Sequence, residues 1–220
     1  MRDSNWLKEF ACDITSQHGE DGMIAKIFEV ITPKNKWCVE FGAWDGKDHS
    51  NTWNLIKNED WKSVQIEPHK TRFAELLKTY DLEVGTNRVI CLNKNVGIVP
   101  GILLDEILSC TPVPFNFDFL SIDIDSFDYQ VWQLFRNYRP QVILIECCPD
   151  FRNGEFHIQD DSTKYFGSSL ASITALGKEK GYELVGTIGV NAFFVLGELY
   201  QLFEIKNNAV SNYKIYTTSG

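Results

Sequence analysis

The fold of this chain is decided by the stretch Trp37-Cys38-Val39-Glu40-Phe41-Gly42-Ala43-Trp44-Asp45-Gly46. It is a short apolar run that ends in an acidic residue and opens into a turn bounded by glycines, which is typical of a nucleoside-binding strand end. A second β-rich segment, Ser63-Val64-Gln65-Ile66-Glu67-Pro68, also ends in a carboxylate, the group that holds a ribose in doubly wound α/β folds. Together the two segments predict a nucleoside cofactor.

Strand-like and helix-like segments alternate along the chain, with short polar breaks between them. The expected strands are 36–41, 62–66, 88–92, 117–123 and 141–146, followed by an antiparallel pair at 182–185 and 191–196. The expected helices are 19–31, 50–58, 69–80, 102–109, 127–137 and 168–180. This order predicts an α/β, Rossmann-like, doubly wound fold, with a mostly parallel seven-stranded sheet, a terminal antiparallel pair and helices on both faces.

The 220 residues predict one domain, because a chain of this length with 44% hydrophobic residues builds a single good core. We expect an N-terminal helical lead over 1–35, a Rossmann-like core over 36–196 and a C-terminal extension over 197–220. Within the core, residues 148–166 show no clear period and predict an irregular cover over the site. The stretch from Gln201 onward offers no chemistry, and we expect it to pack on a neighbouring copy in a homo-oligomer or to fray.

Charge and hydropathy exclude several classes of partner. The formal net charge of -9 disfavours nucleic acid, whose binding draws most of its affinity from Lys and Arg on phosphates. No apolar run approaches the roughly 20 residues needed to span a bilayer, and the N-terminus lacks the apolar core of a signal peptide. We therefore expect a cytoplasmic protein without a nucleic-acid or membrane partner.

Acidic residues end four of the expected parallel strands: Glu40, Glu67, Asp123 with Asp125, and Glu146. These ends meet at the carboxyl edge of the sheet, where open α/β folds bind their ligands. A dinucleotide needs a glycine cradle for its pyrophosphate, whereas this turn carries its own carboxylate, Asp45, so NAD is disfavoured. S-adenosylmethionine has no phosphate and carries a sulfonium and an ammonium group, so an acidic edge favours it.

Three motifs in order resemble the class I S-adenosylmethionine-dependent methyltransferases, and within them the FkbM-like group. Ser16-Gln17-His18-Gly19-Glu20-Asp21 is similar to that group's N-terminal segment, residues 39–46 to its first cofactor motif, and Ile66-Glu67-Pro68 to its ribose-binding acidic motif. The resemblance covers residues 15–196. It implies S-adenosyl-L-methionine as the cofactor and methyl transfer as the reaction.

The resemblance also implies roles for individual residues. Glu40 and Gly42 would contact the methionine part, Glu67 would hold the ribose hydroxyls, and Asn93 or Asn95 would lie near the adenine. The full set that we expect to bind the cofactor is Gln17, Glu40, Gly42, Ala43, Trp44, Asn51, Glu67, Pro68, Asn93, Asn95 and Asp123.

The chain departs from the FkbM pattern after the fourth strand, where Asp123-Ile124-Asp125-Ser126-Phe127-Asp128 stands in place of Lys-x-Asp-x-Glu-Gly. In one interpretation Asp125 and Glu146 hold a Mg²⁺ ion that lowers the pKa of an acceptor hydroxyl, an arrangement similar to that of some sugar O-methyltransferases. In a second, Asp125, Asp128 or His157 is a general base that removes the acceptor proton. In a third, Asp123 is a buried, satisfied acceptor and Asp128 caps a helix start.

The expected function is therefore methyl transfer to a hydroxyl of a small molecule or of a sugar or glycan. One alternative is a metal-dependent glycosyltransferase that uses Asp123-Ile124-Asp125 as a DxD motif for a nucleotide sugar. A second alternative is a non-catalytic nucleoside-binding domain that keeps the fold.

Overall fold

The computed structural model describes residues 1–124, 127–152, 154–160 and 167–216. Its centre is a seven-stranded sheet in the order β3-β2-β1-β4-β5-β7-β6. The strands are β1 (Trp37–Phe41), β2 (Lys62–Ile66), β3 (Val89–Leu92), β4 (Phe119–Ile122), β5 (Val142–Glu146), β6 (Tyr182–Ile188) and β7 (Asn191–Leu196). The first five pair in parallel, and β7 runs antiparallel to both β5 and β6. The predicted fold is confirmed.

Helices follow the strands in the alternating order that the sequence predicts. They are α1 (Glu20–Val30), α2 (Trp53–Asn58), α3 (Lys70–Thr79), α4 (Asp81–Gly85), α5 (Leu104–Leu108), α6 (Asp128–Leu134), α7 (Leu170–Glu179) and α8 (Gly197–Tyr200). Short 3₁₀ helices lie at Trp6–Phe10, Gln201–Phe203 and Val210–Asn212. Among the described residues, no helix has the length and apolarity that crossing a bilayer requires.

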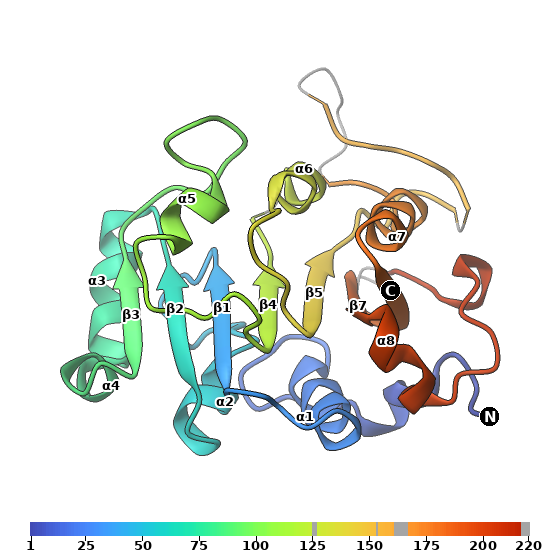
Figure 1. The fold of residues 1–220 in the computed structure, drawn as a ribbon, viewed down its shortest axis with the longest axis horizontal. Coiled ribbons are helices and arrows are strands. Elements are labelled where there is room, and N and C mark those ends of the chain that lie inside the picture. Colours follow the sequence, from blue (N-terminus) through green and yellow to red (C-terminus); the bar gives the residue numbers. More distant parts are fainter. Residues whose placement is uncertain (125–126, 153, 161–166, 217–220) are drawn as a thin grey trace.

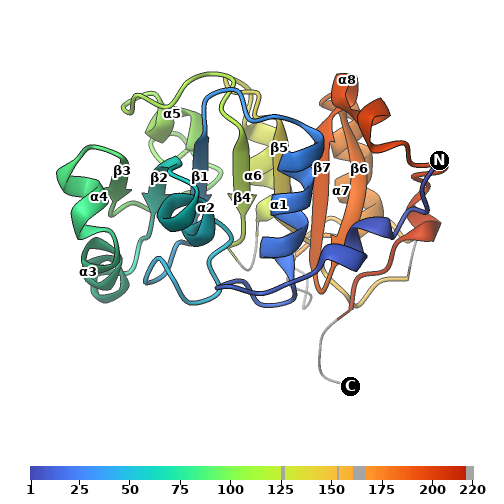
Figure 2. The ribbon, with the colours of Figure 1, turned by 90° about the horizontal axis from the view of Figure 1, so that it is seen from below.

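The helices cover both faces of the sheet (Figure 2). On one face, apolar side chains of α5, α6 and α7 pack against the strands, and on the other those of Trp6–Phe10, α1, α2 and α3 do so. All five residues of β1 are buried, because a central parallel strand is covered on both sides. The arrows of the parallel strands point to one common edge, which is where open α/β sheets bind their ligands (Figure 1).

Three details differ from the sequence-based prediction. The expected break after Tyr80 contains the extra helical turn α4, and β6 continues past Val185 to Ile188 through an irregularity at Leu184 and Gly186. The C-terminal stretch packs on its own chain up to residue 216: Tyr213 is fully buried in the core. These residues therefore complete the domain instead of extending from it.

Candidate active site

A cavity of about 840 Å³ opens at the carboxyl edge of the sheet. It lies where the strand order reverses, because the chain runs outward from β1 to β3 in one direction and from β4 to β6 in the other. Ligands of open α/β sheets bind at this switch point, and cavities of about 300–1,000 Å³ take small molecules. The strand ends contribute Glu40, Gly42, Glu67, Asp123, Glu146 and Asn191 to its wall.

Gly42 allows the ends of β1 and β4 to meet. Its φ of 73° lies in the left-handed region, and a Cβ atom at this position would lie 2.1 Å from the backbone oxygen of Asp123. No side chain fits between the two strand ends. The glycine that the sequence places after the first strand is therefore required by the close approach of β4.

Glu67, at the end of β2, is 3% exposed and holds the glycine turn to the next helix. Its Oε2 accepts the N–H of Trp44 at 2.8 Å, and its Oε1 accepts the N–H of His69 at 2.7 Å. An ionised carboxylate has about four acceptor positions. Among the described residues these two donors are its hydrogen-bond partners, so about two positions remain for a ligand in the cavity.

Glu40, at the end of β1, has three hydrogen-bond donors around its carboxylate. It accepts hydrogen bonds from the Ser50 hydroxyl at 2.7 Å, the Thr52 hydroxyl at 2.6 Å and the Asn51 N–H at 2.8 Å. Burial raises the pKa of Glu40, and these three hydrogen bonds oppose that rise. Glu40 therefore anchors the segment before α2 as well as facing the cavity.

Trp44 lies in the turn between the two carboxylates. Its φ of 49° is in the left-handed region, which a bulky residue rarely adopts. The guanidinium of Arg72, on α3, lies 4.1 Å from the centre of the indole ring. This cation–π contact and the hydrogen bond to Glu67 hold the turn against the first residues of α3.

The N-terminal segment reaches the cavity through a loop that two acidic residues hold. Asp21 Oδ2 accepts the backbone N–H groups of residues 14–16 at 2.8–2.9 Å. Glu20 Oε2 accepts the N–H groups of Gln17 and His18 at 3.1 and 2.8 Å. The acidic pair thus fixes the backbone of the loop, and Gln17 becomes part of the cavity wall.

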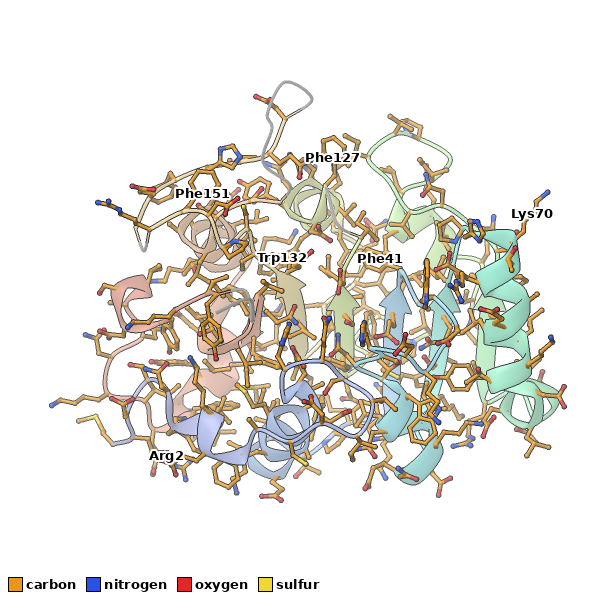
Figure 3. All side chains as sticks on the ribbon, turned by 180° about the vertical axis from the view of Figure 1, so that it is seen from behind. Arg2, Phe41, Lys70, Phe127, Trp132 and Phe151 are labelled. Carbon is orange, nitrogen blue, oxygen red and sulfur yellow. The ribbon has the colours of Figure 1, made fainter. Side chains whose placement is uncertain are left out.

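The ends of β4 and β5 supply the other side of the cavity. Asp123 and Glu146 line it, together with Ile124 and Phe127. In Figure 3, Phe127 lies beyond the end of β1, marked by Phe41, at the edge to which the parallel strands point. This part of the wall therefore combines two carboxylates with two apolar side chains.

The structure brings most of the predicted cofactor residues together. Those that line the cavity are Gln17, Glu40, Gly42, Ala43, Trp44, Glu67, Pro68, Asn95 and Asp123. Asn51 and Asn93 are not among the residues that line it. The Asn51 amide donates to the Ser121 hydroxyl at 3.2 Å, and the Asn93 amide donates to the carbonyl oxygens of Glu67 and Pro68 at 2.8 and 3.0 Å. Both side chains are thus hydrogen-bonded to residues in or just after the strands β2 and β4.

None of the predicted catalytic residues that the structure describes lines the cavity. Asp125 lies outside the described residues. Asp128 is 1% exposed, and its Oδ1 accepts the N–H of Ile124 at 3.0 Å. The N-cap residue of α6 is Phe127, and Asp123 is exposed, so the third interpretation, a buried Asp123 with Asp128 as the helix cap, is wrong. His157 stacks on Phe151 at 4.3 Å between ring centres, in the segment after β5 that runs past α6 and α7 (Figure 1).

The irregular cover over the site, residues 148–166, and the Mg²⁺ site also remain predictions. None of the described residues of 148–166 lines the cavity. Among the described residues, no group of three or more His, Cys, Asp or Glu side chains forms a metal-ion site. Glu146, one of the two expected Mg²⁺ ligands, lines the cavity, and the other, Asp125, is outside the described part.

The charge of the cavity favours a cationic ligand. Its described wall contains five carboxylates, with one lysine and no arginine: Glu40, Asp48, Glu67, Asp123 and Glu146 against Lys94. His49 and His69 also line it. A diphosphate would meet net repulsion here, whereas a sulfonium and an ammonium group would be attracted.

Sequence reasoning missed one wall residue with an unusual environment, Asn191. It is the first residue of β7 and pairs in register with Glu146. Because β7 is antiparallel to β5, its first residue reaches the same edge as the last residue of β5. The sequence predicts the antiparallel pair, but only the register of β7 against β5 places Asn191 opposite Glu146.

Comparisons with known proteins agree on the fold. No protein-family model matches the chain, and no curated protein matches it either. The CurJ carbon methyltransferase superposes with a TM-score of 0.53 at 9% identity, over 80% of this chain and 52% of that chain. A Haemophilus influenzae protein provisionally named a methylase superposes with a TM-score of 0.51 at 16% identity, over 80% and 96%.

The fold is that of the class I methyltransferases. A Galdieria sulphuraria protein, provisionally named a sarcosine dimethylglycine methyltransferase, aligns at 14% identity with a TM-score of 0.49, over 76% of this chain and 62% of that chain. The chain thus spans less than two thirds of this protein and of the CurJ methyltransferase. Identities this low show a shared fold and leave the activity to be argued from the site.

Proposed function

We propose that this protein is an S-adenosylmethionine-dependent methyltransferase. The observation that carries the proposal is Glu67, a buried carboxylate at the switch point with about two acceptor positions left toward the cavity. Two such positions match the two adjacent hydroxyls of a ribose. The five carboxylates of the wall suit a cofactor that is cationic at its reactive end.

The donor and acceptor groups of the cavity fit this cofactor. Glu67 would hold the ribose, and the turn from Gly42 to Trp44 leaves room for the chain that leads to the sulfur. Glu40 and Gln17 face the region where an ammonium group would lie. The cofactor supplies an electrophilic methyl group on a sulfonium, which moves to a lone pair of the acceptor as the carbon–sulfur bond breaks.

The remaining residues would orient the acceptor and take its proton. We propose a hydroxyl acceptor, on a small molecule or a glycan, because the net charge of -9 opposes nucleic acid. Glu146 and Asp123 are carboxylates in the described wall that a hydroxyl can reach, and either can hold its proton. Alternative general bases in this proposal are Asp125, Asp128 and His157. A further alternative is a Mg²⁺ ion held by Asp125 and Glu146, which would lower the pKa of the acceptor hydroxyl.

The kinship with the FkbM-like group is part of the same proposal. It rests on the three sequence motifs, and the structure adds a physical reason for the first. In the motif Ser16 to Asp21, the two acidic residues hold the loop that carries Gln17 to the cavity.

Calorimetric titration of the purified protein tests the cofactor. We expect S-adenosylhomocysteine to bind with micromolar affinity, and UDP-glucose with Mn²⁺ to give no heat of binding, with or without EDTA. Binding of UDP-glucose only when Mn²⁺ is present would overturn the proposal in favour of the glycosyltransferase. If neither S-adenosylhomocysteine nor UDP-glucose binds, the result would favour a domain that has kept the fold without this cofactor.

A further inference from the structure

The cavity continues past the place where the proposed cofactor ends. With its ribose on Glu67 at β2, the methionyl group adds about 6 Å of extended chain. The sheet edge from β2 to β7 spans four strand spacings, or about 19 Å. A cofactor held in this way would lie over β1 and β4 and would leave the ends of β5 and β7 for another molecule.

The residues of β5 and β7, and of the turn before β7, that line the cavity are Glu146, Val190 and Asn191. Glu146 and Asn191 are directly opposite each other in the antiparallel pair of β5 and β7. Opposite residues of such a pair point to the same face, with Cβ atoms about 4.5–5.5 Å apart. Their side-chain oxygens are thus spaced to meet two neighbouring groups of one ligand.

The amide of Asn191 has a fixed orientation. Its Nδ2 donates to Oε1 of Glu20 at 2.8 Å, and Glu20 is 1% exposed. An ionised carboxylate only accepts hydrogen bonds, so the NH₂ group must face Glu20 and the Oδ1 atom must face away from it. Glu20 therefore decides which atom of Asn191 is left for another partner.

The Oδ1 atom of Asn191 has no hydrogen-bond donor among the described residues. Asn191 is 6% exposed, and its Oδ1 is buried without a hydrogen-bond partner among the described residues. A buried amide oxygen without a donor costs free energy, which an O–H or N–H group of a ligand removes. A polar ligand that donates hydrogen bonds is thus favoured at this end of the cavity.

We propose that Glu146 and Asn191 form the acceptor subsite, and that the acceptor is a polyhydroxylated ring whose adjacent hydroxyls donate to Asn191 Oδ1 and to the Glu146 carboxylate. This inference rests on the proposed methyl transfer, because it assigns the second substrate of the same cavity. One hydroxyl of the pair is held by Asn191, a positioning residue, while its neighbour lies against Glu146. Glu20 sets the orientation of the amide from behind.

Nuclear magnetic resonance titration of the protein saturated with S-adenosylhomocysteine tests the subsite. The probe is methyl α-D-mannopyranoside, and the matched control is 2-methoxytetrahydropyran, which has the same ring without hydroxyls. We expect the mannoside to shift the side-chain NH₂ signals of Asn191 and the backbone signal of Val190. The control should bind more weakly by about tenfold or more, the value of one or two lost hydrogen bonds.

The variant Asn191→Leu separates the subsite from the cofactor site. It should weaken mannoside binding by about tenfold while S-adenosylhomocysteine affinity stays within about twofold. If this variant fails to fold, the shift of the Asn191 NH₂ signals in the unaltered protein still shows whether the mannoside binds at Asn191. The inference is wrong if the mannoside binds no better than the control, shifts signals elsewhere, or binds Asn191→Leu as tightly as the unaltered protein.

The same titration without S-adenosylhomocysteine distinguishes the two proposals. Mannoside binding at Asn191 in a protein that does not bind S-adenosylhomocysteine would reject methyl transfer and keep a polyol site. Binding of S-adenosylhomocysteine without any mannoside shift at Asn191 would reject the subsite and keep methyl transfer.

Discussion

Asp118 and Glu67 are two buried carboxylates at opposite edges of the same sheet, and they differ in what they leave unsatisfied. Asp118, just before β4, accepts the N–H groups of residues 34–36 and the amide of Gln141, which fills its four positions. Glu67 accepts two N–H groups and faces a cavity. Burial alone therefore does not mark a binding residue, whereas a half-filled carboxylate beside a cavity does.

The largest effect is expected from Asp118→Ala. It would leave three backbone N–H groups and one side-chain amide without an acceptor, and we expect the free energy of unfolding to fall by about 3–5 kcal/mol. Urea unfolding measures this change. Glu29→Ala, which breaks an exposed ion pair with Lys26, is the matched control and should cost about 0.5 kcal/mol or less. An unchanged midpoint for Asp118→Ala would show that the two carboxylates do not differ as described.

Glu67→Gln should act on the ligand more than on the fold. Replacing one acceptor oxygen with NH₂ removes hydrogen bonds to a charged group, so S-adenosylhomocysteine affinity should fall by about 2–3 kcal/mol, or about 30- to 150-fold. Calorimetry measures this loss, and the folded fraction of Asp118→Ala should bind with unaltered affinity. Equal losses of S-adenosylhomocysteine affinity in Glu67→Gln and Asp118→Ala would show that the two carboxylates do not differ in ligand binding.

Gly42→Ala tests the contact that brings the cavity edge together. The new methyl group would collide with the carbonyl of Asp123, and we expect a loss of about 2 kcal/mol in stability together with weaker S-adenosylhomocysteine binding. Gly101→Ala is the control, because Gly101 also has a positive φ but no atom lies within 4 Å of the added Cβ. It should cost about 1 kcal/mol and leave binding intact. Equal behaviour of the two variants would show that the approach of β4 to β1 does not matter.

The smallest effect is a pH dependence that comes from Glu40. Burial raises the pKa of Glu40 above its value in the unfolded chain, so the folded state binds the proton more tightly. The free energy of unfolding should therefore fall as the pH rises from 4.5 through the raised pKa. Urea unfolding at a series of pH values measures this slope, which Glu40→Gln should flatten. A steeper slope in Glu40→Gln would contradict the direction of the shift.

The sheet was predictable because its strands are short apolar runs, four of which are closed by acidic residues. The ranges expected for the strands and most helices agree with the structure to within a few residues. The helical turn α4 was missed, since its five residues, Asp81–Gly85, are too few to show a period. The burial of Tyr213 was missed because it depends on where the chain returns after β7, which no local pattern encodes.

The candidate site was predictable in part. Residues at strand ends, such as Glu67 and Glu146, line the cavity because topology alone brings them to one edge. Asn51 and Asn93 were expected to touch the ligand, but their amides serve neighbouring polar groups of the chain, and sequence spacing does not reveal which way an amide points. The position of Asn191 at the cavity could not be predicted without the register of β7 against β5.

The hydrogen bond between Glu20 and Asn191 joins residues 171 positions apart in the chain. During synthesis the loop that carries Gln17 emerges from the ribosome well before its partner strand. The cavity therefore acquires its final wall only when β7 has paired with β5. Binding of the proposed acceptor to a nascent chain would accordingly report that synthesis has passed Asn191, and a shorter chain would present a cavity open on one side.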